Sequence, residues 1–177
     1  EDYQPGLVSV ESDSNITYKT SHKPGGTATV VNLTWASRIS QRLQDKYGRW
    51  SGVTLDRVDR HCCHILTVYQ ANYTNAAQHP KSAYAQQRAM FLQEGRSNID
   101  CRQNFVIDLQ SLLSKLHSPT SAIIIGGDFN CNLRNDYTAL AQLFLRLGLV
   151  DVHHDRHPSL QPTHTWQEGR DQIDYVF

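Results

Sequence analysis

The spacing of apolar and polar residues predicts strands in the first part of the chain and at its end. Residues 27–33 (TATVVNL) are β-branched and mostly apolar, which is typical of a strand. Residues 52–58 and 64–69 have the same character, and the polar residues 59–61 between them predict a hairpin. Residues 172–177 begin a further strand. Together these segments indicate an antiparallel or mixed sheet.

Helical spacing prevails between these strands. Apolar residues recur at i, i+4, i+7, i+8 and i+11 across residues 105–116, and a shorter stripe spans 140–147, so we expect two amphipathic helices. The first stripe consists of Phe105, Leu109, Leu112, Leu113 and Leu116, and the second of Leu140, Leu143, Phe144 and Leu147. Residues 82–93 favour a helix that Gly95 ends, and the polar residues 37–46 predict a short helix.

The remaining segments indicate how these elements are organised. Residues 122–125 (AIII) form a continuous apolar run between turn signals, which is typical of a strand buried on both faces. Residues 1–26 are polar and turn-rich, and residues 70–80 have the composition of a loop. Because no repeat or linker interrupts the 177 residues, we expect a single domain over 1–177 with an α/β or α+β fold around a sheet.

Composition argues against a membrane protein and leaves nucleic-acid binding open. Apolar residues make up 39% of the chain, and no apolar run approaches the ~20 residues that cross a bilayer, so we expect no membrane partner. The chain has no secretory signal and no initiator Met, so we expect an intracellular protein, with the nucleus as one candidate compartment, whose sequence begins upstream. Four irregularly spaced cysteines predict reduced thiols. Lys plus Arg equals Asp plus Glu at 17 each, which neither favours nor excludes nucleic-acid binding, because metal ions can neutralise phosphate.

Polar side chains stand where three predicted strands end or begin. Asp128 and Asn130 directly follow the apolar run and two glycines, and alternation along an extended chain would aim both to one side. A carboxylate and an amide placed in this way can hold a water molecule or ligate a hard cation, although the same residues also shape ordinary turns. Tyr69 and Asn72 follow a strand in the same manner. Asp174 lies inside an apolar strand, where a charge is costly unless it is paired or bound.

The order of these motifs resembles the endonuclease/exonuclease/phosphatase superfamily, the DNase I-like proteins. The resemblance rests on strand-Tyr-x-x-Asn at 69–72, Gly-Asp-Phe-Asn at 127–130 and Ile-Asp-Tyr at 173–175. Lys-Pro-Gly-Gly-Thr-Ala at 23–28 and Thr-His-Thr-Trp at 163–166 add to it. The pattern is most similar to the endonuclease domains of non-LTR retrotransposons.

The resemblance implies a four-layer αββα sandwich that hydrolyses phosphodiesters with Mg²⁺ or Mn²⁺. Asp128 and Asn130 would activate water and bind the metal, and Tyr69 would stabilise charge at the phosphate. Asn72 and Thr165 would contact the substrate, and Asp174 would orient a catalytic histidine. The family's metal-binding Glu and its closing Ser-Asp-His motif have no counterpart in this sequence, so we expect an incomplete domain that is inactive in isolation. An incomplete domain would also have open sheet edges, so we expect poor solubility.

Two histidine-containing segments offer other metal chemistry. His153, His154 and His157 follow a predicted helix, and a solvated turn is the favoured interpretation. Residues 61–64 (HCCH) have the composition of a zinc site, but adjacent ligands on a strand point to opposite faces.

The leading hypothesis is therefore a divalent-metal phosphodiesterase, a DNA endonuclease of a retrotransposon. Its partner would be DNA, with RNA as an alternative, and a reverse transcriptase could be fused to it. A phosphatase or lipid phosphodiesterase of the same fold is one alternative, because one scaffold serves several substrates. A non-catalytic remnant that serves as a binding module is another.

Overall fold

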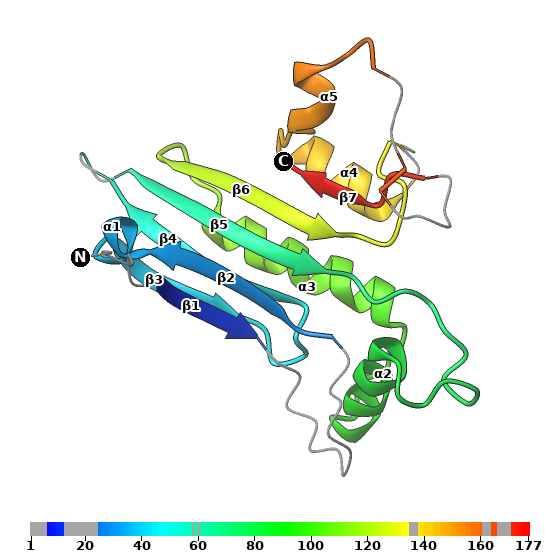
Figure 1. The fold of residues 1–177 in the computed structure, drawn as a ribbon. Coiled ribbons are helices and arrows are strands. Elements are labelled where there is room, and N and C mark those ends of the chain that lie inside the picture. The colour runs from blue at the N-terminus through cyan, green and yellow to red at the C-terminus, as the bar shows by residue number, and fades with distance from the viewer. Residues whose placement is uncertain are drawn as a thin grey trace, which may run out of the picture.

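The computed structural model describes residues 7–12, 25–57, 59, 61–134, 138–160, 164–165 and 171–177. A five-stranded sheet with the order β3-β4-β5-β6-β7 forms its centre (Figure 1). Its strands are β3 (Ile39–Gln44), β4 (Trp50–Asp56), β5 (Cys62–Tyr69), β6 (Ser121–Asp128) and β7 (Asp174–Val176). Strands β5 and β6 are parallel, whereas the other neighbours pair antiparallel. The predicted hairpin is confirmed as β4–β5.

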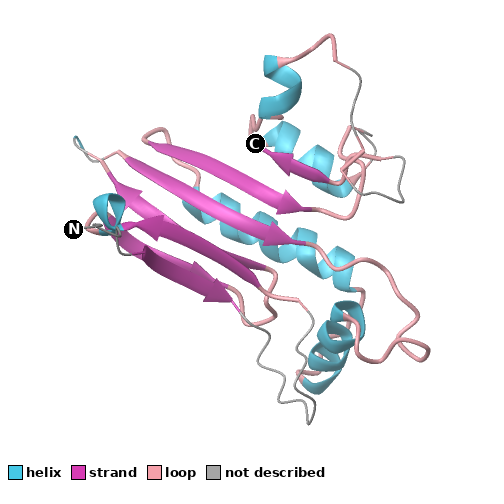
Figure 2. Cartoon of the chain, viewed as in Figure 1, coloured by secondary structure: helices cyan, strands magenta, loops and turns pink. Residues whose placement is uncertain are grey.

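Two of the helices pack on one face of this sheet, and a small second sheet, which helix α1 (Leu33–Ala36) contacts, covers part of the other. The other helices are α2 (Ala83–Gln93), α3 (Cys101–Leu116), α4 (Ala139–Arg146) and α5 (Val152–Arg156). Strands β1 (Leu7–Ser12) and β2 (Thr27–Asn32) pair antiparallel and pack on β3, β4 and β5. Figure 2 shows α3 and α4 behind the central strands and the small sheet in front. The expected α/β class is confirmed as a central sheet with flanking helices.

The apolar stripes of α3 and α4 build the main core. Leu109 and Leu113 of α3 and Leu143 of α4 pack against Leu66 and Ile125 of the sheet, and all five are at most 2% exposed. Short polar side chains cap these helices, because the first N–H groups of a helix lack intrahelical acceptors. Ser82, Asp100 and Thr138 accept from backbone N–H groups at the starts of α2, α3 and α4. None of the described helices has the length and apolar character that a bilayer crossing needs.

The structure corrects four expectations from the sequence. Residues 39–44 form strand β3 where a short helix was expected, because Ile39 and Leu43 turn towards the core while β4 supplies backbone partners. Residues 7–12 form strand β1, which the polar composition of this region did not predict. Ile124 is 44% exposed, so β6 is not buried on both faces. Residues 152–156 form helix α5 instead of a turn. All four cysteines are free, as expected.

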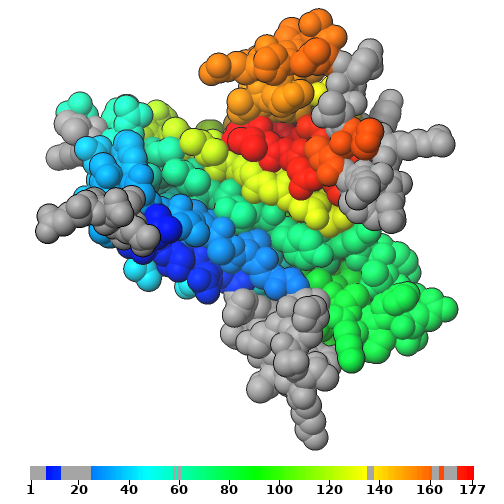
Figure 3. Space-filling model, in the orientation of Figure 1, coloured from blue at the N-terminus to red at the C-terminus, as the bar shows by residue number. Residues whose placement is uncertain are grey.

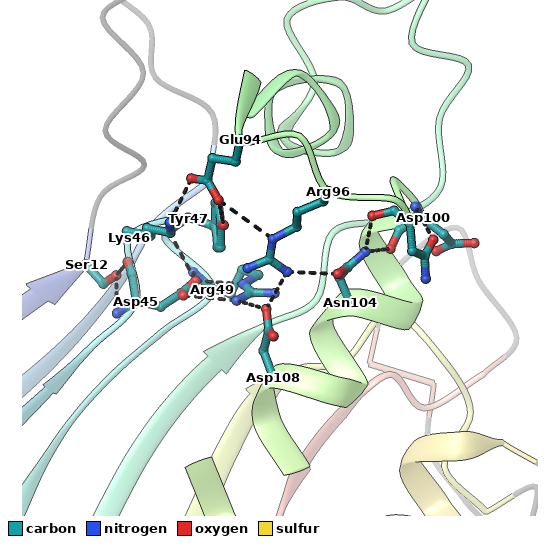
Figure 4. Close-up of polar contacts among 11 residues, drawn as sticks. Ser12, Asp45, Lys46, Tyr47, Arg49, Glu94, Arg96, Asp100, Asn104 and Asp108 are labelled. Atoms are coloured by element: carbon teal, nitrogen blue, oxygen red, sulfur yellow. Dashed lines mark hydrogen bonds and ion pairs between the residues drawn. The ribbon is translucent and has the colours of Figure 1, made fainter. Parts of the chain in front are cut away.

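A network of ion pairs ties the β3–β4 turn to α2 and α3 (Figure 4). The Arg49 side chain is 1% exposed, and its Nε and Nη2 atoms donate to Asp45 at 2.7 and 3.0 Å. Nη2 also donates to Asp108 of α3 at 2.8 Å. Arg96 extends the network from Asp108 to Glu94 at the end of α2. The backbone oxygen of Arg49 accepts from the N–H of Tyr69, so the network supports the end of β5.

Candidate active site

Three neighbouring strands bring the predicted catalytic residues to one edge of the sheet. Tyr69 at the end of β5 pairs with Asp128 at the end of β6, and Asp128 pairs with Asp174 at the start of β7. Neighbouring strands lie about 4.8 Å apart and registered side chains share a face, so the row spans roughly 10 Å. The convergence that the sequence predicted for Tyr69, Asp128 and Asp174 is therefore present.

Asn130 joins this row through a turn and not through an extended strand. Strand β6 ends at Asp128, and Asn130 adopts a left-handed backbone with φ of 46°, a conformation that Asn tolerates better than most residues. Its N–H and its Nδ2 atom donate to the two oxygens of Asp128 at 2.8 and 3.0 Å. Nδ2 also donates to the backbone oxygen of Gln70 at 2.7 Å. The Asp128–Asn130 pair is thus held rigidly beside β5.

The residue before Asp128, Gly127, must be a glycine for steric reasons. Its φ is 145°, and a Cβ atom at this position would lie 2.0 Å from the backbone oxygen of Val68. Such an overlap would push β5 and β6 apart at the very point where Tyr69 and Asp128 face each other. A glycine is therefore required for the two strands to meet at the rim.

The electrostatics of the rim favour the protonated forms of Asp128 and Tyr69. Burial raises the pKa of Asp128, and the nearby Asp174 carboxylate raises it further, whereas hydrogen bonds from Asn130 and the charge of Arg102 lower it. Burial also raises the pKa of the Tyr69 phenol, with a further contribution from Asp128. Tyr69 therefore keeps its proton at neutral pH and can donate a hydrogen bond to an anionic oxygen.

Thr165, whose predicted contact with substrate stays a prediction, is exposed and holds the start of β7. Its Oγ1 atom accepts from the N–H groups of Ile173 and Asp174 at 3.0 and 3.1 Å. Thr163 and Trp166 of the same motif lie outside the described residues, as do Lys23 and Pro24 of the early one.

Asn72, the second predicted substrate contact, lies beyond the end of β5 and not on a strand. It is exposed in the loop that follows β5, and no hydrogen bond joins its side chain to another described residue. The contact of Asn72 with substrate stays a prediction.

An open cleft of about 680 Å³ adjoins Asp174 and Thr165. Its far wall is formed by α5 and the residue that follows it, which contribute His153, Arg156 and His157. These histidines were expected in a solvated turn, without a role. The signal that could have found them is their spacing, because residues 153, 156 and 157 stand at i, i+3 and i+4 and share one face of a helix.

The described residues offer a hard cation only part of a ligand set. Asp128, Asp174 and Asn130 carry oxygen atoms at the rim, which is the donor chemistry that Mg²⁺ prefers. Magnesium takes about six oxygen ligands, and the described part of the chain contains no group of three His, Cys, Asp or Glu placed to hold a metal. The rim thus fits a divalent cation in donor type and falls short in donor number.

The HCCH segment is not a zinc site in the described structure. His64 is 5% exposed, its Nδ1 atom bonds Thr54 Oγ1 at 2.9 Å, and its Nε2 atom lies 3.4 Å from Cys62 Sγ. Both ring nitrogens are therefore engaged within the sheet, and burial lowers the pKa of the imidazole.

Known structures share this fold. An apurinic/apyrimidinic (AP) endonuclease from Leishmania major, LMAP, superimposes with a TM-score of 0.61 at 15% identity, over 97% of this chain and 61% of that protein. An endonuclease/exonuclease/phosphatase family protein from Leptotrichia buccalis C-1013-b matches with a TM-score of 0.45 at 13% identity, over 98% and 60% of the two chains. This chain thus spans about three fifths of the length of both proteins. No curated protein matches it.

The family itself is recognised across nearly the whole chain. Residues 2–177 match the Endonuclease/Exonuclease/phosphatase family. The match includes every strand of the central sheet and the row of Tyr69, Asp128 and Asp174 at its rim. The chain belongs to the endonuclease/exonuclease/phosphatase family, whose fold is DNase I-like.

Proposed function

We propose that this chain carries part of the active site of a divalent-metal-dependent nuclease that hydrolyses phosphodiester bonds in DNA. The observation that supports this most directly is the register of β5, β6 and β7, which aligns Tyr69, Asp128 and Asp174 on one face of the sheet. A structural role alone would not explain two neighbouring acidic groups at the same rim.

Each rim residue has a chemical task in this proposal. Asp128 orients the attacking water and accepts its proton, and Asn130 fixes the orientation of the Asp128 carboxylate through two hydrogen bonds. Tyr69 donates a hydrogen bond to a non-bridging oxygen of the scissile phosphate, where negative charge develops. Asp174 is the acceptor that would fix the ring of a catalytic histidine.

A divalent cation would be held by Asp128 and Asn130 and would supply charge neutralisation at the phosphate. Because the described rim offers fewer oxygen atoms than Mg²⁺ requires, we expect the 177-residue chain alone to bind the ion weakly.

DNA is the favoured substrate for two reasons. One structural neighbour, with a TM-score of 0.61, is named as an AP endonuclease. The motif order also resembles the endonuclease domains of non-LTR retrotransposons, so a natural context beside a reverse transcriptase follows as part of the proposal. His153, Arg156 and His157 line the cleft beside Asp174, where they could contact the phosphates of a DNA strand.

The test is a plasmid-nicking assay with the protein at its natural full length. We expect nicking in Mg²⁺ that stops on addition of a chelator, and a loss of at least about 100-fold for Asp128→Ala, in line with the usual contribution of a general base. The matched control is Asp56→Ala, which removes an exposed carboxylate at the end of β4 and should nick at the wild-type rate.

Two outcomes would count against the proposal. Nicking that persists in Asp128→Ala would remove the rim from the mechanism. Turnover of phosphomonoesters or phosphoinositides with intact DNA would assign the same rim to a phosphatase or lipid phosphodiesterase.

A further inference from the structure

A cavity opens on the helix side of the sheet, directly behind the catalytic rim. It has a volume of about 390 Å³ and lies between α3, the start of α4 and the segment that follows Asn130. Gln70 and Cys131, which come next to Tyr69 and Asn130 in the sequence, both line it. The cavity and the rim therefore share one stretch of backbone, with the catalytic side chains facing one side of the sheet and the cavity the other.

Backbone hydrogen bonds connect the two sites. The N–H of Gln70 donates to the backbone oxygen of Asp128 at 2.9 Å, and the oxygen of Gln70 accepts from Asn130 Nδ2. Arg102 of α3 lines the cavity, and its Nη1 atom donates to the backbone oxygen of Asn130 at 3.1 Å. A group bound in the cavity would thus lie next to the residues that position the attacking water.

The polar groups of the cavity would pair with a ligand that has both hydrogen-bond donors and acceptors. Gln70 is 2% exposed, and its Oε1 atom is buried without a hydrogen-bond partner among the described residues. A buried acceptor without a partner costs about 1–3 kcal/mol unless a ligand or water donates to it. The Arg102 guanidinium offers only donors. An inorganic anion could satisfy Arg102 but not Gln70 Oε1.

The walls of the cavity are apolar and suit a flat ring. Val106 and Ile107 of α3, Leu140 of α4 and Cys131 line it, and Ile107 is 58% exposed at its edge. Apolar walls with a few polar groups are typical of sites for small organic rings, which bury most of their surface in pockets of roughly 300–1,000 Å³. The cavity falls at the lower end of this range.

We infer that this cavity is a nucleobase subsite, which receives a base that turns out of the strand whose phosphate lies at the rim. A nucleobase combines a flat apolar body with neighbouring donors and acceptors on its edge, which matches the walls, Gln70 Oε1 and Arg102. The inference rests on the proposed function and deepens it, because a base pocket beside the rim selects nucleic acids over phosphomonoesters that lack a base.

Binding of a fluorescent nucleotide to the intact protein tests this inference without catalysis. The probe is 2-aminopurine riboside 5′-monophosphate, titrated in the presence of chelator. We expect saturable binding, competition by adenosine 5′-monophosphate, and at least about tenfold weaker competition by ribose 5-phosphate, which keeps the phosphate and lacks the base. Equal competition by both would overturn the inference.

Two variants locate the binding. Gln70→Leu removes the unpaired acceptor while leaving its backbone hydrogen bonds, and Ile107→Trp fills the edge of the cavity from an exposed position that folding does not depend on. Each should weaken probe binding at least about tenfold. The matched controls are Gln110→Leu and Ser111→Trp, exposed positions on α3 that do not line the cavity. Wild-type affinity in Ile107→Trp would overturn the assignment.

The same measurements separate this inference from the proposed function. Metal-dependent nicking that needs Asp128, together with no base-dependent binding, would overturn the subsite and leave the nuclease. Base-dependent binding that both variants weaken, in a protein that cleaves no phosphodiester, would support the subsite and overturn the nuclease.

Discussion

Asp128 illustrates how much one residue's surroundings determine its chemistry. Burial raises its pKa, and Asp174 on the neighbouring strand acts in the same direction. A carboxyl whose pKa is higher in the folded state binds protons more tightly there than in the unfolded chain. Its contribution to stability is therefore fully present below the unfolded pKa and is lost as the pH rises through the folded pKa. Ionisation of Asp128 in the folded state thus costs stability.

Two substitutions should move the pKa of Asp128 in opposite directions. Asp174→Asn removes a neighbouring negative charge and should lower it, whereas Arg102→Gln removes a positive charge and should raise it. The measurement is a carbon-13 NMR titration of the Asp128 carboxyl group in both variants. If both substitutions shift the pKa of Asp128 in the same direction, the charges of Asp174 and Arg102 do not act on it as described.

Some of these residues could be found from the sequence, and others could not. Tyr69, Asp128 and Asp174 each follow or begin an apolar run, so their position at a strand end was predictable. Parallel pairing of β5 and β6 then places Tyr69 beside Asp128. Gln70 and Arg102 carry no such signal, because their importance arises from contacts across 60 and 28 residues of sequence, to Asn130. Only a folded structure brings these partners together.

At the scale of elements, the β3–β4 turn shows a similar limit. Residues 37–46 are polar with two apolar residues four apart, a spacing that occurs on helices. Their strand conformation follows from antiparallel pairing with β4, an interaction with a distant segment that overrides local preference. Strand β1 was missed for the same reason, because its partner β2 and the underlying strands supply the contacts. Helices α3 and α4 were predicted correctly, because each has an apolar stripe that can be read from its own segment of the sequence.

The buried ion pair in this turn should be essential for stability. Asp45→Ala would leave Arg49 buried with the Asp108 carboxylate as its remaining acidic partner, and removing one partner of a buried pair costs roughly 3–5 kcal/mol. Urea denaturation followed by circular dichroism measures the loss. The control is Lys46→Ala, which breaks an exposed ion pair with Glu94 and should leave the midpoint close to that of the wild type. Equal midpoints for both variants would contradict a structural role for the network.

At the scale of the whole molecule, the small sheet leaves part of the large one uncovered. Strands β1 and β2 pack on β3, β4 and β5, and in Figure 3 the surfaces of β6 and β7 lie beside them without such cover. Ile124 is 44% exposed and Val176 is 50% exposed on this face. The register places both on the same side as Asp128, so an open apolar face extends from the rim that carries Asp128. Among the described strands, β7 is the last of its sheet and has no strand beyond it.

An open apolar face next to a free strand edge predicts self-association of the 177-residue chain. Replacing Ile124 and Val176 together by Thr keeps the β-branched shape that strands favour while adding a hydroxyl, so the double variant should shift towards monomer. Sedimentation velocity across the micromolar range measures this shift. The matched control is Leu145→Thr, which changes a side chain on α4 that is 69% exposed and distant from the open face. If the control dissociates as far as the double variant, association depends on general surface hydrophobicity and not on this face. If the wild type is already monomeric, the uncovered strands are tolerated in water, and the expectation of poor solubility is wrong.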